Sequence, residues 1–253
     1  MEQLPYLKKI TLKRDQVISF NEFPFTIPAI NKFDSLEFDK KITIFVGENG
    51  SGKSTLLEAI AVGLGFNAEG GSKNFNFGTR NTHSQLHECI RFSKSFKKFR
   101  DGFFLRAESF YNVATNIDEL DEQPISPFLS VPDIKEGYGG KSLHHQSHGE
   151  SFLSLMINRF FGNGLYILDE PEAALSPTRQ LAVLSRIHQL IEKESQFIIA
   201  THSPILMAYP NAQLLQINAS GISPIHYKDT EHYNVMKAFL NNPESMYQEL
   251  FAK

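Results

Sequence analysis

The chain has 253 residues, of which 41% are hydrophobic and 21% charged, and its formal net charge is −3. That length and composition are those of a folded domain and exclude a disordered chain. The net negative charge excludes an overall positive electrostatic field of the kind that attracts nucleic acid, while a local basic patch remains possible. The single cysteine, Cys89, excludes an internal disulfide framework and a cysteine-based zinc site.

The start of the chain, MEQLPYLKKITLKRDQ, is charged and interrupted by Pro5, which does not fit a signal peptide. No apolar run approaches the ~20 residues that a membrane-spanning helix needs. We therefore expect a soluble, cytoplasmic protein with no membrane insertion of its own.

Hydrophobic periodicity and turn residues predict the elements of the first half of the chain. A short strand leads into a turn at residues 39–41, which is followed by a strand at residues 42–46 and a helix at residues 54–65. Residues 80–99 are predicted to be helical, and residues 102–110 are predicted to form a strand.

The second half begins with an irregular connection at residues 121–146, where prolines and glycines lie among polar residues. A helix at residues 149–161 and a strand at residues 164–170 follow, then a helix at residues 176–193 and a strand at residues 195–203. Alternating strands and helices of this kind predict a parallel sheet covered by helices.

Residues 47–54, GENGSGKS, match the phosphate-binding pattern G-x-x-x-x-G-K-[ST] at every fixed position, between the predicted strand and helix. Glycines allow successive backbone N–H groups to point at phosphate oxygens, and the helix N-terminus adds its dipole. Lys53 is expected to reach the β- and γ-phosphates, and the Ser54 hydroxyl is expected to bind Mg²⁺. The candidate nucleotide-binding residues of this loop are Gly47, Glu48, Asn49, Gly50, Ser51, Gly52, Lys53, Ser54 and Thr55.

Two adjacent carboxylates end the apolar strand in LYILDEPEAALSP. Asp169 is placed to hold Mg²⁺, directly or through water, and Glu170 to orient and polarise the attacking water. A later buried strand, FIIATHSP, ends at His202. Because ligands collect at the carboxyl ends of parallel strands, His202 is expected to reach the γ-phosphate as a donor.

A second anion-binding feature precedes a predicted helix in the stretch QSHGESFL. Ser147 and Gly149 lie at the helix N-terminus, and Glu150 follows them. One ATP needs only one such cradle in most P-loop enzymes, so a second copy suggests that another protomer donates it. Ser147, Gly149 and Glu150 are therefore candidate nucleotide-binding residues acting on a partner's ATP.

These four motifs stand in the order and at the spacing of ABC-type ATPases, which the chain resembles from about Leu36 to Pro204. The S-x-G-E signature and the stretch DEPEAALSP are closer to the soluble SMC, RecF-like and OLD-like branch than to transporter subunits. As a whole the chain is similar to a compact family of bacterial predicted AAA/ABC ATPases.

The resemblance implies an α/β fold of the ABC-type P-loop class: a mostly parallel central sheet, an N-terminal antiparallel portion and a helical lobe that carries the signature. It implies a single domain over residues 1–253. Residues 1–80 and 160–253 would form the nucleotide-binding lobe, and residues from about 81 to 159 the helical lobe.

By the same resemblance, ATP and Mg²⁺ are the cofactors, and two ATP molecules are buried in a head-to-tail homodimer. Ala173 to Ser176 match a loop that crosses the dimer interface, with Ser176 where transporters usually have aspartate. Family members usually have a glutamine that senses Mg²⁺ after a mid-chain strand. Glu108 stands at the comparable place here, which leaves the coupling to the partner open. No aromatic shelf for the adenine is readable in the sequence, so the preference for ATP over GTP stays open as well.

Two further features have competing interpretations. Residues 91–100, RFSKSFKKFR, are predicted to place three phenylalanines on one helical face with basic side chains around them. This is a candidate contact for nucleic acid, or a helix with a solvated basic rim. Histidine pairs and clusters, at His83 and His87 and at residues 144–148, lack the carboxylate pattern of a zinc motif.

The predicted activity is ATP binding and hydrolysis coupled to dimerisation. For what hydrolysis drives, three hypotheses remain: a DNA-associated ATPase of repair or defence type, the nucleotide-binding subunit of a membrane transporter, or an ATP-timed switch for a protein effector.

Overall fold

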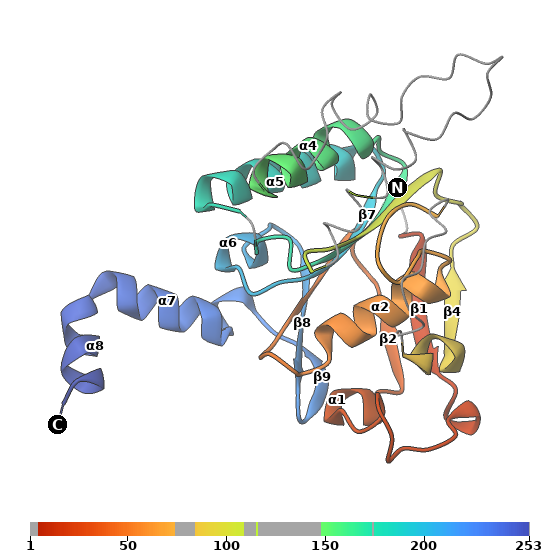
Figure 1. The fold of residues 1–253 in the computed structure, drawn as a ribbon, viewed down its shortest axis with the longest axis horizontal. Coiled ribbons are helices and arrows are strands. Elements are labelled where there is room, and N and C mark those ends of the chain that lie inside the picture. Colours follow the sequence, from red (N-terminus) through yellow and green to blue (C-terminus); the bar gives the residue numbers. More distant parts are fainter. Residues whose placement is uncertain (1–4, 74–83, 109–114, 116–147, 174, 253) are drawn as a thin grey trace.

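A computed structural model describes residues 5–73, 84–108, 115, 148–173 and 175–252 of the chain (Figure 1). Within these residues, two β-sheets and the helices around them form the fold. None of the helices in the described ranges has the length and apolar character needed to cross a membrane.

The central sheet has six strands in the order β5-β6-β7-β3-β8-β9. Its first five strands run parallel, and β9 pairs antiparallel with β8 at one edge. Strands β3, β6 and β7 are buried along their whole length, as is expected for a parallel sheet with both faces covered. The strands are β3 Ile42–Val46, β5 Asp101–Arg106, β6 Gly164–Asp169, β7 Gln196–Ala200, β8 Gln213–Asn218 and β9 Gly221–Pro224.

A smaller antiparallel sheet has the order β2-β1-β4, from β1 Leu7–Leu12, β2 Ser35–Glu37 and β4 Ile90–Lys94. Its register pairs Ile10 with Leu36 on one side and with Phe92 on the other. The predicted antiparallel portion near the N-terminus and the mostly parallel central sheet are therefore both confirmed.

Helices cover the two faces of the central sheet, and each face has its own apolar core. The first core joins α2 and the antiparallel sheet to side chains such as Leu165 and Ile167 of β6, whereas the second joins α4, α5 and α6 to Tyr166 and Leu168 of the same strand. Successive side chains of β6 enter opposite cores because neighbouring residues of a strand point to opposite faces of the sheet. The helices are α1 Pro28–Asn31, α2 Lys53–Gly63, α4 His148–Arg159, α5 Pro177–Glu192, α6 Pro204–Met207, α7 Glu231–Asn241 and α8 Pro243–Leu250, and short 3₁₀ turns lie at Arg14–Gln16, Gln85–Cys89 and Tyr227–Asp229.

The prediction of a helix over residues 80–99 is wrong. After the 3₁₀ turn Gln85–Cys89 the chain forms β4, in which Ile90 and Phe92 alternate with polar residues and pair with β1. Hydrophobic and polar residues alternate here with the two-residue period of a strand, but basic residues at helical spacing made that pattern hard to recognise. Hydrogen bonding to β1 stabilises the strand.

The predicted shared face of Phe92, Phe96 and Phe99 consequently does not exist. Phe92 packs closely over Gly63 of α2, Phe96 is fully exposed, and Phe99 stacks on Phe66. Residues 84–106 contribute β4 and β5 to the two sheets, so this part of the expected helical lobe is not helical.

The C-terminal helices α7 and α8 extend away from the rest of the molecule as an arm (Figure 1). Neither helix contains a buried residue. Several large apolar side chains of this arm are exposed: Val235, Met236, Leu240, Tyr247, Leu250 and Phe251.

Candidate functional site

The phosphate loop connects β3 to α2, as predicted, and its conformation requires glycine. Gly52 has φ +104° and Gly50 has φ +76°, which is the left-handed region that other residues rarely adopt. A Cβ atom on Gly47 would lie 2.2 Å from the carbonyl oxygen of Ile217 on β8. Residues 48–50 are exposed, whereas Gly52 and Lys53 are buried at the start of the helix.

The Lys53 ammonium folds back into the loop. Its Nζ donates hydrogen bonds to the carbonyl oxygens of Gly47 at 2.9 Å and Glu48 at 2.8 Å. Burial lowers the pKa of Lys53, and the nearby carboxylates of Glu170, Asp169 and Glu172 oppose that shift. A buried cation is thus held at the mouth of the loop, close to three carboxylates.

Ser54 and Asp169 meet although they lie 115 positions apart in the chain. The Ser54 hydroxyl, in the first turn of α2, donates to Oδ1 of Asp169 at the end of β6 over 3.0 Å. Burial raises the pKa of Asp169 to about 6, and Arg106 and the hydroxyl of Ser54 oppose the shift. Because a hydroxyl and a buried carboxylate are hard oxygen ligands, this pair fits the donor set that Mg²⁺ prefers.

Glu170 follows Asp169 with φ +51°, a conformation that is strained for a residue with a side chain. Its backbone N–H donates to the carbonyl of Ala200 on β7, which helps to hold this geometry. The carboxylate Oε1 lies 3.6 Å from Nε2 of His202. The two predicted catalytic side chains therefore lie side by side at the carboxyl ends of neighbouring strands.

Two neighbours hold His202 in place. Its backbone N–H donates to Oε1 of the half-buried Glu172 over 2.5 Å, and its Nδ1 lies 2.9 Å from Nε2 of His232 at the start of α7. The pKa of His202 is lowered by burial first, then by the charges of Lys53 and His232, and Glu170 acts in the opposite direction. The imidazole is therefore neutral at pH 7.

Sequence reasoning missed three residues of this site. Glu172 lies in the quoted stretch after Glu170, and its nearness to two other carboxylates could have drawn attention to it. Arg106 at the end of β5 contacts Glu58 of α2 at 2.8 Å and lies 3.8 Å from Asp169. His232 had no local signal, because it enters the site only through the placement of α7.

A cavity of about 410 Å³ opens beside the phosphate loop. Residues 46–51 form one wall, residues 216–219 at the end of β8 form a second, and Thr230, Glu231 and His232 form a third. The space is of the size that small-molecule sites have in proteins. It lies directly beside the phosphate loop.

The candidate signature residues lie elsewhere. Ser147 lies outside the described residues, while Gly149 and Glu150 occupy the first turn of α4. Oε1 of Glu150 pairs with Arg179 of α5 over 3.0 Å. The helices α4 and α5 cover the opposite face of the sheet from α2 (Figure 1).

The structure also shows the local contacts of Ser176 and Glu108. Ser176 caps α5, where its hydroxyl accepts a hydrogen bond from the backbone N–H of Arg179 over 3.4 Å. Glu108 is exposed just beyond β5, and its carboxylate lies 3.5 Å from Arg106. Arg106, the last residue of β5, lies 3.8 Å from Asp169, one of the proposed Mg²⁺ ligands.

A family model and several known proteins match the chain. Residues 19–198 match the AAA domain family. A protein named as an ABC transporter ATP-binding protein, TTE0246 of Caldanaerobacter subterraneus subsp. tengcongensis, is 26% identical over 197 residues, which cover 70% of this chain and 77% of that protein. The ABC transporter G family member STR2 of Medicago truncatula is 26% identical over 176 residues, which cover 64% of this chain. The chain spans 24% of that plant protein.

Two solved structures superpose on the chain. The ATP-binding cassette MJ1267 of an ABC transporter, in its ADP conformation, superposes with a TM-score of 0.50 at 18% identity, covering 96% of this chain and 97% of that one. The SMC head domain of Thermotoga maritima superposes with a TM-score of 0.46 at 17% identity, covering 87% and 99% of the two chains. The similarity to MJ1267 confirms the predicted ABC-type P-loop fold.

Proposed function

Because the chain belongs to the AAA domain family, we propose that it binds ATP with Mg²⁺ at the phosphate loop and hydrolyses it to ADP and phosphate. The observation that carries this proposal is the meeting of Ser54 and Asp169 at 3.0 Å, with Glu170 and His202 beside them. Nucleotide binding is the property that the family and the fold support. Hydrolysis is inferred from the arrangement of the carboxylates.

Binding rests on the loop and on Lys53. The backbone N–H groups of residues 47–55 surround the phosphates, and Lys53 exchanges its two carbonyl partners for the β- and γ-phosphate oxygens. Ser54 and Asp169 would hold Mg²⁺, which supplies a positive charge that offsets the charge developing on the phosphates. Arg106, through its contacts with Glu58 and Asp169, keeps the Asp169 carboxylate ionised and in position.

Hydrolysis rests on Glu170 and His202. The Glu170 carboxylate, 3.6 Å from Nε2 of His202, orients a water molecule toward the γ-phosphate. His202, neutral at pH 7, donates a hydrogen bond from Nε2 to the γ-phosphate. Both side chains then act on the same phosphorus centre from neighbouring strand ends.

The proposed dimer rests on the signature turn. Gly149 and Glu150 lie in the first turn of α4, on the other face of the central sheet from α2, and in the proposed dimer they contact the ATP of a second protomer. In the proposed arrangement, Ser147, Gly149 and Glu150 of one copy close over the phosphate loop of the other. Closure excludes bulk water around the nucleophile, and product release separates the protomers.

The test compares wild type with Glu170→Gln and Lys53→Ala. We expect Glu170→Gln to bind ATP, to hydrolyse it at least about a hundredfold more slowly, and to elute as a dimer in size-exclusion chromatography with ATP and Mg²⁺. Lys53→Ala is the blank for both readouts. A Glu170→Gln protein that stays monomeric with bound ATP contradicts the dimer mechanism, and unchanged hydrolysis contradicts the role of Glu170.

For the work that hydrolysis drives, we favour a DNA-associated ATPase of the SMC, RecF-like or OLD-like type. The S-x-G-E signature and the basic residues between Arg91 and Arg100 support this. ATP hydrolysis measured with and without single- and double-stranded DNA, at low and at raised salt, tests it. Salt-sensitive stimulation supports the DNA role, and a rate indifferent to DNA rejects it.

Two other roles have an observation in their favour. The name of TTE0246 supports a nucleotide-binding subunit of a transporter, for which co-purification with a membrane protein is the expected result. The exposed arm α7–α8 supports a switch for a protein effector, because His232 at its start contacts His202 in the ATP site. Removal of residues 243–253 would then leave basal hydrolysis intact and abolish the response to that effector.

A further inference from the structure

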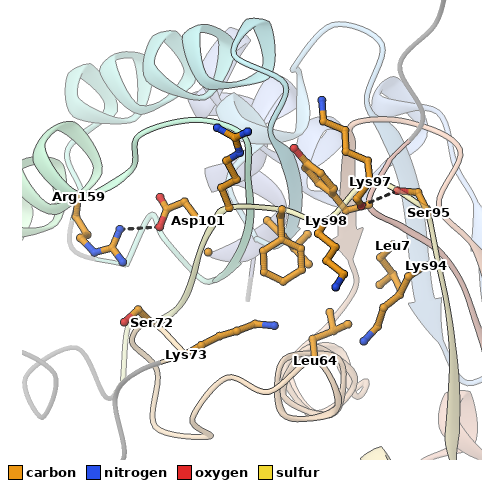
Figure 2. A pocket seen from close by; sticks show the side chains of 15 residues that line it. Leu7, Leu64, Ser72, Lys73, Lys94, Ser95, Lys97, Lys98, Asp101 and Arg159 are labelled. Atoms are coloured by element: carbon orange, nitrogen blue, oxygen red, sulfur yellow. Dashed lines mark hydrogen bonds and ion pairs between the residues drawn. The ribbon is translucent and has the colours of Figure 1, made fainter.

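A second cavity, of about 420 Å³, lies at the other end of the central sheet from the phosphate loop (Figure 2). It is bounded by Leu64, after the last turn of α2, and by the beginnings of β5 and β6 at Asp101 and Leu165. The phosphate loop lies at the opposite ends of α2 and of the parallel strands. The cavity is therefore separate from the ATP site.

Positive side chains converge on this cavity. Figure 2 shows Lys73, Lys94 and Lys98 extending into the same space, whereas Lys97 turns away from it. Lys97 is instead paired with Glu194. Like charges that share a cavity repel each other, so their convergence requires a compensating anion or solvent.

The cavity wall supplies no such anion from the described residues. Asp101 is the acidic side chain in the lining, and it is already engaged by Arg159 at 2.7 Å and by the Tyr166 hydroxyl at 2.6 Å. Within the described part of the chain, Lys73, Lys94 and Lys98 form no ion pair with a carboxylate. The three ammonium groups thus remain available to a ligand.

The floor of the cavity is apolar. Leu7, Leu64, Leu165 and Phe99 line it, and the Lys73 ammonium lies 4.3 Å from the centroid of the Phe99 ring. Burial and the charge of Lys94 both lower the pKa of Lys73, which agrees with a partly desolvated cluster of like charges. An apolar floor beneath a charged rim is typical of sites for small organic ligands.

We propose that this cavity binds a phosphate-bearing organic anion, with the phosphate on Lys73, Lys94 and Lys98 and the organic body against Phe99 and the leucines. Phosphate matches the cluster because it accepts charge-assisted hydrogen bonds from several ammonium groups at once. A nucleoside monophosphate and the 5′-phosphate end of a nucleic acid strand share this chemistry. The proposal holds whether or not the chain hydrolyses ATP.

The test measures binding by calorimetry in EDTA, with Lys53→Ala as the host so that the phosphate loop does not contribute. The probes are AMP and a 5′-phosphorylated oligo(dT), each with its unphosphorylated counterpart, adenosine or oligo(dT). We expect a phosphorylated probe to bind and its counterpart to bind at least about tenfold more weakly. Binding of AMP identifies a free nucleotide, and binding of the oligonucleotide alone identifies a nucleic acid end.

Charge variants then locate the site. Lys73→Gln combined with Lys98→Gln is expected to weaken binding about tenfold or more, whereas Lys40→Gln, which removes a charge from the exposed turn before β3 outside the cavity, leaves it unchanged. Lys98→Glu alone serves as a second variant that leaves the Lys73–Phe99 packing intact. The proposal is overturned if neither phosphorylated probe binds at millimolar concentration, if the lysine variants bind normally, or if Lys40→Gln weakens binding equally.

Discussion

Nδ1 of His202 lies 2.9 Å from Nε2 of His232, which links the end of β7 to the first turn of α7. A hydrogen bond between two neutral imidazoles needs one N–H and one lone pair. If His232 donates from Nε2, then Nδ1 of His202 accepts, and the proton of His202 lies on Nε2, the atom nearest Glu170. His232 would thereby set the tautomer that the proposed role of His202 requires.

We expect His232→Ala to lower kcat for ATP hydrolysis about three- to tenfold, with little change in KM, because the tautomer of His202 is no longer imposed. His232→Gln offers an N–H donor at similar reach and should recover much of the rate. Steady-state kinetics of both variants provides the measurement. Equal losses in the two variants would show that His232 matters only for packing.

The lowered pKa of His202 predicts how stability depends on pH. Because the folded state binds this proton less readily than the unfolded chain, a penalty to folding grows as the pH falls below the ordinary histidine pKa of about 6.5. Wild type should therefore lose more thermal stability than His202→Asn between pH 7.5 and 5.5. Thermal denaturation at each pH gives the two Tm values. An equal fall in Tm for the two proteins would contradict the lowered pKa of His202.

The raised pKa of Asp169 predicts a pH dependence of stability opposite to that of His202, with a penalty to folding that grows as the pH rises. Its pKa rises from 3.8 to about 6 because the ionised carboxylate is buried, a shift worth about 3 kcal/mol once the group is charged. Asp169→Asn should thus be more stable than wild type by roughly 1–3 kcal/mol at pH 7.5, while it loses Mg²⁺-dependent hydrolysis. The gain should shrink as the pH falls toward 4, since wild type then protonates Asp169. Chemical denaturation at both pH values measures it, and a variant less stable at pH 7.5 would refute the expectation.

Two glycines of the loop offer a matched comparison. A Cβ on Gly47 meets a backbone carbonyl at 2.2 Å, whereas a Cβ on Gly50, with φ +76°, has no neighbour within 4 Å. We expect Gly50→Ala to cost about 1–2 kcal/mol from backbone strain alone and Gly47→Ala to cost about 2–4 kcal/mol, because β8 must move. Urea unfolding of both variants distinguishes strain from steric overlap. Similar losses would mean that the loop can shift away from β8.

The sequence determined the core of this protein through local patterns. The phosphate loop, the Asp169–Glu170 strand end and the His202 strand end were each readable, since each motif sits at a junction that hydrophobic periodicity marks. The parallel direction of the central strands followed from their alternation with helices. The prediction of a helix over residues 80–99 was wrong because this short segment is compatible with both the helical and the strand periodicity.

Tertiary structure decided what no local pattern carries. Ser54 and Asp169 approach each other only because β3 and β6 both flank β7 in the sheet. Glu172, Arg106 and His232 reach the site through strand order and through the path of α7, which places residues distant in the chain within hydrogen-bonding range. The lysine cavity likewise gathers Lys73, Lys94 and Lys98 from separate segments. Local sequence specifies which residue types end each element, but the pairing of elements determines which of those ends meet.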